Sequence, residues 1–158
     1  MSTELVMNTV LEARELFLAL QAIQNRIHQQ LLSRDISALQ QTLKEQSGFV
    51  SKVRQNATLR SRLLKGMGYE VSGVGIKKMI ATMPVSQRET ALSEWIKLEQ
   101  SIVYCQELNK LNGKVQARLS SVTRRLLNMM NDHFYRVGTY SSNGVAIPMD
   151  GHHEIGNA

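Results

Sequence analysis

The longest uninterrupted helical pattern in this chain runs from Pro84 to Arg136. It contains no further proline and a single glycine, Gly113. Apolar residues recur along it in steps of three and four, which places them on one face of a helix. This stripe is interrupted once, at Leu108–Gly113. Its members are Ala91, Trp95, Leu98, Ile102 and Cys105 before the interruption, and Val115, Leu119, Val122, Leu126 and Met129 after it. A helix of roughly 50 residues is about 75–80 Å long at 1.5 Å per residue. The apolar stripe is therefore too long to be buried in one small core, and other helices must cover it.

A first helix is predicted over residues 2–32. Apolar side chains from Val6 to Leu31 keep heptad spacing, and Gln24 is the one polar residue in this seam. The short break that follows ends at Asp35, a residue type whose side chain accepts hydrogen bonds from free backbone N–H groups at a helix start. Because a connection of two or three residues makes neighbouring helices antiparallel, we expect a helical hairpin.

A second helix is predicted over residues 36–65. Its seam is interrupted by Gln46 and Arg60, and Gly48 lowers helix propensity by up to about 1 kcal/mol relative to alanine without shifting the phase of the pattern. The expected core positions of this helix are Ile36, Leu39, Leu43, Val50, Val53, Ala57 and Leu64.

A glycine-rich segment, residues 66–75, follows the second helix. A dinucleotide-binding fingerprint would need glycine at the position held by Val71, and the Gly-Lys-Ser/Thr of a phosphate-binding loop is missing. We therefore interpret the segment as a linker, followed by a short helix over residues 76–82.

These patterns predict an all-α fold: an antiparallel helical hairpin plus one long C-terminal helix, in an elongated, coiled-coil-like three-helix bundle. The long helix is expected over residues 84–136, and a single helical domain over residues 1–136. Residues 137–158 are rich in Gly, Ser, Asn and His and lack apolar periodicity, so we expect a flexible tail.

The composition indicates a cytoplasmic protein. The N-terminus lacks the pattern of a secretory signal peptide, and no apolar run is long enough to span a membrane. The one cysteine, Cys105, has no partner for an internal disulfide. Because it lies on the apolar stripe, we expect a buried, unreactive thiol.

No pattern in the sequence predicts catalysis or cofactor binding. The histidines do not have the spacing of a zinc site: they are His28, His133, His152 and His153. We expect no enzyme activity, no cofactor, no metal and no small-molecule substrate.

The formal net charge of +6 raises the question of nucleic-acid binding. The basic residues are scattered, and no aromatic residues are interleaved with them as a platform for base stacking. A solvated basic surface is the favoured interpretation, so nucleic acid is not an expected partner.

The C-terminal half of the long stripe is the candidate functional surface. Hairpin helices of about 30 residues, or about 45 Å, would cover the long helix only to near Asn112. The apolar side chains beyond that point would need another partner: Val115, Leu119, Val122, Leu126, Met129 and Met130. We expect this stripe to bind a foreign helix or a second copy of the chain, a weak homodimer.

Three motifs resemble the FlgN family of flagellar type III secretion chaperones. The turn ending at Asp35 leads into a leucine-repeat helix, as in that family. The run from Leu108 through Asn109 and Asn112 to Gly113 resembles the family's Leu-Asn-x-x-Asn-Gly signature. The third motif, Thr139-Tyr140-Ser141-Ser142-Asn143-Gly144, is similar to the family's Tyr-Gly-x-x-Gly motif, with Ser141 where the family often has glycine.

The resemblance implies a helical export chaperone without enzyme activity. It implies binding to the C-terminal helical segments of the flagellar hook–filament junction proteins, prevention of their premature assembly, and delivery to the flagellar type III export apparatus. It places partner contacts on Val115 through Met130 and on Tyr140, with the tyrosine as the expected contact of the export gate.

Two questions remain open from the sequence. Asn109, Asn112 and Gly113 suit either direct binding or helix packing, because asparagines in a seam fix register and glycine permits close approach. The alternative functions are a self-associating coiled-coil adaptor and a basic nucleic-acid-binding helical bundle.

Overall fold

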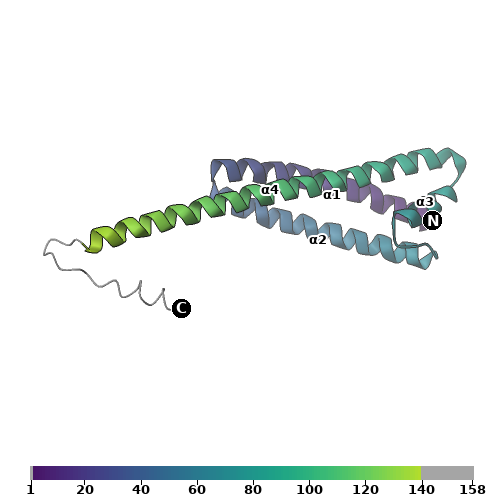
Figure 1. The fold of residues 1–158 in the computed structure, drawn as a ribbon. Coiled ribbons are helices and arrows are strands. Elements are labelled where there is room, and N and C mark those ends of the chain that lie inside the picture. Colours follow the sequence, from purple (N-terminus) through teal and green to yellow (C-terminus); the bar gives the residue numbers. More distant parts are fainter. Residues whose placement is uncertain (1, 140–158) are drawn as a thin grey trace. The chain divides into compact units, whose positions relative to one another are not determined.

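The computed structural model describes residues 2–139, with part of the side chains from Val122 onward left out. Within this range it contains four α-helices and no strand (Figure 1): α1 (Ser2–Ser33), α2 (Ile36–Gly66), α3 (Gly73–Ala81) and α4 (Val85–Thr139). The predicted all-α class is confirmed. The chain divides into two compact units, Met1–Val115 and Gln116–Ala158.

In the first unit, α1 and α2 lie side by side in opposite directions (Figure 1). Arg34 makes the turn between them with a φ of 55°, in the left-handed region. Asp35 then caps α2, because its Oδ1 accepts a hydrogen bond from the backbone N–H of Ala38 at 3.1 Å. The short connection is thus built from one strained residue and one capping residue.

The predicted core positions of α2 are only partly correct. Ile36 and Leu43 are 61% and 42% exposed, whereas the fully buried residues of α2 are Thr42, Asn56 and Leu64. Asn56 Nδ2 donates to the backbone oxygen of Thr9 at 3.0 Å in the close contact with α1. Leu64 was predicted correctly, but the sequence pattern missed Thr42 and Asn56 because both are polar and carry no apolar signal.

The main hydrophobic core gathers residues from all four helices. Its members share near-complete burial: Val6, Val10, Ala13, Leu64, Ile76, Met79, Ile80, Met83, Ala91, Trp95 and Leu98. The short helix α3 begins at Gly73, earlier than the predicted Ile76, and supplies three of these side chains. These three side chains lie in the segment predicted as a short helix, which thus forms part of the core.

One glycine at this core is required by close packing. The backbone N–H of Gly75 donates to the capping oxygen of Ser72 at 3.3 Å. A Cβ atom placed on Gly75 would lie 1.8 Å from the carbonyl oxygen of Glu70, far inside van der Waals contact. Gly75 therefore lets the chain turn back on itself before α3.

The long helix α4 retains helical structure through Asn112 and Gly113 and is described as far as Thr139. Its last fully buried residue, among those whose side chains are described, is Asn112. None of the described helices combines the length and the apolar character that crossing a membrane requires.

Candidate partner-binding surface

A cluster of amide side chains joins α1 to α4 at the family-like motif. Gln24 and Asn112 are each 5% exposed. Asn112 Nδ2 donates to the backbone oxygen of Gln24 at 2.9 Å and to its Oε1 at 2.8 Å. Gln24 Nε2 donates to Asn109 Oδ1 at 3.3 Å. The polar seam residue of α1 is thus paired with both asparagines of the motif.

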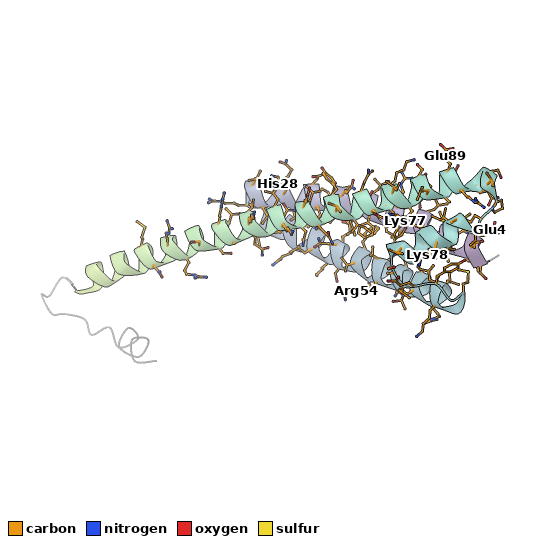
Figure 2. The ribbon with its side chains drawn as sticks, turned by 45° about the vertical axis from the view of Figure 1, so that its right-hand side comes forward. Glu4, His28, Arg54, Lys77, Lys78 and Glu89 are labelled. Atoms are coloured by element: carbon orange, nitrogen blue, oxygen red, sulfur yellow. The ribbon has the colours of Figure 1, made fainter. Side chains whose placement is uncertain are left out.

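The side-chain oxygen of Asn112 also faces α1. His28 Nδ1 lies 3.1 Å from Asn112 Oδ1, within hydrogen-bonding distance, and Figure 2 shows His28 on this part of α1. Because a buried amide costs free energy unless its donors and acceptor are satisfied, these bonds favour one axial register of α4 on α1. The contacts support the packing interpretation for Asn109 and Asn112.

Gly113, the next residue, is in a different environment. It is exposed, and no described atom lies within 4 Å of a Cβ atom placed on it. Leu108, at the start of the motif, is half-buried. Close approach by a neighbouring backbone of the described chain therefore does not explain the glycine.

The predicted binding stripe lies on α4 after this motif. Val115 and Leu119 are half-buried, and Met129 is 66% exposed. The backbone at Val122, Leu126 and Met130 is helical, but their side chains lie outside the described part of the structure, as do Tyr140 and Gly144 entirely.

Exposed cations accompany the stripe. Arg118, Arg124 and Arg125 are all exposed on the same segment of α4. An apolar helical face with arginines beside it can bury the apolar side of another helix and attract acidic residues that flank it.

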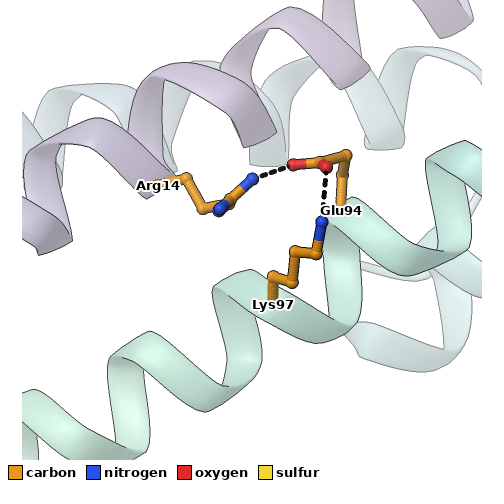
Figure 3. Close-up of polar contacts among 3 residues, drawn as sticks. All are labelled: Arg14, Glu94 and Lys97. Atoms are coloured by element: carbon orange, nitrogen blue, oxygen red, sulfur yellow. Dashed lines mark hydrogen bonds and ion pairs between the residues drawn. The ribbon is translucent and has the colours of Figure 1, made fainter.

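An ion-pair cluster joins the first part of α4 to α1 (Figure 3). Glu94 forms a salt bridge with Arg14 and accepts a second bond from Lys97 Nζ at 3.2 Å. The hydrogen bond from Arg14 is the main reason that the pKa of Glu94 lies below its ordinary value of 4.5. The carboxylate therefore stays ionised at neutral pH and stabilises the contact between the two helices.

Cys105 is buried, as predicted. It is 7% exposed, and its thiol donates to the backbone oxygen of Phe17 at 3.4 Å. Burial raises the pKa of the thiol to about 11, so the reactive thiolate is scarce at neutral pH. In the part of the chain that the structure describes, no group of three or more His, Cys, Asp and Glu side chains is placed to hold a metal ion.

The sequence did not predict a hollow of about 360 Å³ in the first unit. Residues of α1, α2 and α4 line it, and it is open to solvent. Its lining combines apolar side chains with amides: Phe17, Leu20, Gln24, Gln46, Val50, Val53, Arg54, Ile102, Cys105, Gln106 and Asn109. The one available signal was Gln46, a polar interruption in a seam that was expected to be packed.

Comparison with known families shows to which family the chain belongs. A family model described as FlgN protein matches residues 1–146, which include the amide cluster, the hollow and the stripe. The chain belongs to the FlgN family. No curated protein matches the chain, and no solved structure does.

FlgN-family membership confirms the resemblance seen in the motifs. It implies that the protein acts as a flagellar export chaperone and binds flagellar export substrates. FlgN is a family of chaperones and not of enzymes, which argues against catalytic activity.

Proposed function

We propose that this FlgN-family protein is a cytoplasmic chaperone for the flagellar hook–filament junction proteins. It binds their C-terminal helical segments, prevents premature assembly and delivers them to the flagellar type III export apparatus. The observation that carries this proposal is the family match over residues 1–146.

The proposal includes the finer architecture predicted from the sequence. The chaperone is an elongated, coiled-coil-like three-helix bundle made of the hairpin α1–α2 and the long helix α4. Residues 1–136 form its one domain, and residues 137–158 form a flexible tail. The amide cluster of Gln24, Asn109 and Asn112 supports this arrangement by linking α1 to α4.

The substrate segment binds the stripe that follows Gly113: Val115, Leu119, Val122, Leu126, Met129 and Met130. The 66% exposure of Met129 supports this assignment. Affinity comes from burial of apolar surface at about 25 cal/mol per Å², reduced by the cost of ordering the substrate segment. Arg118, Arg124 and Arg125 speed association with an acidic segment more than they strengthen the complex.

The tail has a separate role in the proposal. Tyr140, in the motif that ends at Gly144, contacts the export gate, so that substrate and gate are bound by different parts of the chain. The support for this assignment is the family match, which extends through both residues.

A binding titration tests the substrate site. The probe is a peptide with the C-terminal segment of a junction protein, titrated into wild type, Leu119→Asp and Leu126→Asp. Ser120→Asp is the matched control, because it adds the same charge at an exposed position on another face of the same helical turn. Circular dichroism verifies that all variants stay helical.

We expect both leucine variants to lose binding at least tenfold while Ser120→Asp binds like the wild type. Equal binding by all variants would overturn the stripe as the substrate site. Light scattering across a dilution series measures the oligomeric state and so tests the alternative of a self-associating adaptor. A chaperone should be monomeric, or a weak dimer that the substrate dissociates. A salt-dependent gel shift with DNA would instead favour the nucleic-acid-binding alternative.

A further inference from the structure

The stripe of the proposed function lies next to a concentration of positive charge. Residues 116–130 of α4 contain no acidic residue and three arginines, all of them exposed: Arg118, Arg124 and Arg125. Apolar positions are interleaved with these cations in steps of three and four: Leu119, Val122, Leu126 and Met129. A segment that covers this part of α4 must therefore supply apolar side chains and negative charge together.

The chain itself contains a segment of this composition, beyond the described residues. Residues 140–158 contain two acidic residues, Asp150 and Glu154, and no lysine or arginine. Their largest apolar cluster comes directly before Asp150: Val145, Ala146, Ile147, Pro148 and Met149. An apolar run followed by two carboxylates is the composition that the stripe and its arginines require.

The connection to α4 is long enough for this segment to fold back. Counted along the helix at 1.5 Å per residue, Arg125 lies about 21 Å before Thr139, and Arg118 lies about 31 Å before it. An extended chain spans up to about 3.3 Å per residue, so Asp150 can reach about 36 Å from Thr139 and Glu154 about 50 Å. Both carboxylates can therefore meet arginines of the stripe.

A segment tethered to the stripe has an advantage over a free molecule. A short flexible connection holds it at an effective concentration in the millimolar range, so that even a weak contact is populated. A second copy of the chain suits the stripe poorly, because its own α4 would bring the same three arginines to the contact. The tail of the chain is therefore the occupant that the charges favour.

We infer that residues 145–154 fold back over the stripe and cover it until a substrate displaces them. Ile147 and its apolar neighbours bury the stripe, and Asp150 and Glu154 face its arginines. The inference adds regulation to the site of the proposed function, and it rests on that proposal for the identity of the competing ligand. Most of the covering segment lies after residue 146, where the family match ends.

A fluorescence experiment detects the contact in the full chain without any substrate. Bimane is attached at Ser121→Cys in a Cys105→Ala background, because Ser121 is exposed and lies one helical turn from both Arg118 and Arg125. Ile147→Trp adds the quencher, since tryptophan quenches bimane only at contact distance. Loss of fluorescence therefore reports that the tail lies on this part of α4.

Glu107→Cys is the matched control for the label. It is exposed on the same helix but lies about 48 Å before Thr139 along that helix, whereas residue 147 reaches only about 26 Å from Thr139. Fluorescence at each position is compared with and without Ile147→Trp, so that the native Trp95 contributes equally to both measurements.

We expect Ile147→Trp to quench the label at residue 121 at every protein concentration and to leave the label at residue 107 unchanged. Asp150→Lys/Glu154→Lys should relieve at least half of the quenching. Glu89→Lys/Glu107→Lys changes the net charge equally at exposed positions of the first unit and should relieve little. A peptide with the C-terminal segment of a junction protein should restore the fluorescence.

Removal of residues 145–158 measures the same contact through binding. The peptide should bind the shortened chain about fivefold more tightly, the factor expected when the tail leaves the stripe free in about one molecule in five. The shortened chain keeps Tyr140 and Gly144, which the proposed function assigns to the export gate.

Absence of quenching at residue 121 overturns the inference, whether or not the peptide binds. Equal quenching at residue 107 overturns it as well, and equal relief by Glu89→Lys/Glu107→Lys assigns the contact to net charge. Quenching that rises with protein concentration makes the tail of a second copy the occupant. A peptide that binds without restoring fluorescence overturns the stripe as the substrate site, and with it the competition, while the contact of the tail stands.

Discussion

The side-chain amide of Asn112 on α4 donates hydrogen bonds to both the backbone oxygen and the side-chain oxygen of Gln24 on α1, at 2.9 and 2.8 Å. Both residues are buried, so neither can replace these bonds with water. An amide pair of this kind fixes the register of two helices, because sliding one past the other leaves both groups unpaired. The residue that identifies the family motif thus acts in the interior of the fold.

Replacement of Asn112 by leucine should lower the free energy of unfolding by about 1–3 kcal/mol, because it leaves the buried Oε1 of Gln24 without a donor. Urea denaturation followed by circular dichroism measures the change. Asn25→Leu, at an exposed position of α1, serves as the control and should change stability by less than about 0.5 kcal/mol. The double variant Gln24→Leu/Asn112→Leu should recover most of the loss, and a neutral Asn112→Leu would show that the amide pair is unimportant.

The glycines of the described helices should respond to alanine in opposite directions. Gly48→Ala and Gly113→Ala should each raise the free energy of unfolding by about 0.5–1 kcal/mol, because both positions are helical and no described atom lies within 4 Å of the added Cβ. Gly75→Ala should lower it by about 1–3 kcal/mol through the clash with the Glu70 carbonyl oxygen. Thermal or urea unfolding of the three variants checks the order, and a stabilising Gly75→Ala would contradict the packing before α3.

Acid should weaken the contact between α1 and the first part of α4. The lowered pKa of Glu94 means that its contribution to stability is present above the ordinary value of 4.5 and is lost as the pH falls through the lower pKa of the folded state. We expect the wild type to lose more stability between pH 7 and pH 3 than Glu94→Gln does. Glu107→Gln, at an exposed position of α4, is the control and should follow the wild type. If the free energy of unfolding falls with pH equally in the wild type and in Glu94→Gln, Glu94 does not contribute to the loss of stability in acid.

Alkaline pH should destabilise the protein through Cys105. Below the ordinary thiol pKa of 9.0 the folded and unfolded chains both hold the proton, whereas between 9.0 and about 11 only the folded chain keeps it. The free energy of unfolding therefore falls as the pH rises through this range. Cys105→Ala should lack this part of the decline, which unfolding curves at pH 8 and pH 10.5 can measure. Rapid reaction of the folded thiol at pH 8 would contradict its burial.

Much of the first unit could be predicted because periodicity, capping and glycine placement act locally. The heptad seam of α1 from Val6 to Leu31 is buried as expected except at Phe17, which is half-buried, and Asp35 caps α2. The core of α2 was predicted less well. Which of its faces is buried depends on the distance to its neighbours, and Thr42 and Asn56 carry no apolar signal.

Of the candidate surfaces, the sequence predicted the stripe and did not predict the hollow. Apolar spacing marked the stripe from Val115 to Met130, which stays a proposed binding site. The same spacing predicted that Val50 and Val53 would be packed, but it could not show that they line a hollow. A hollow depends on the distances between three helices, and the residue pattern of one helix does not determine those distances.

The sequence by itself determined that the chain is helical, where most of its helices begin and end, and which family it resembles. These properties follow from residue spacing, helix-capping chemistry and short motifs within one segment. The tertiary structure decided that α3 belongs to the core, that Asn112 pairs with Gln24, and that α1, α2 and α4 line an open hollow. Each of these depends on side chains from distant segments meeting at a particular distance, and burial and hydrogen bonding are set only once the helices have packed.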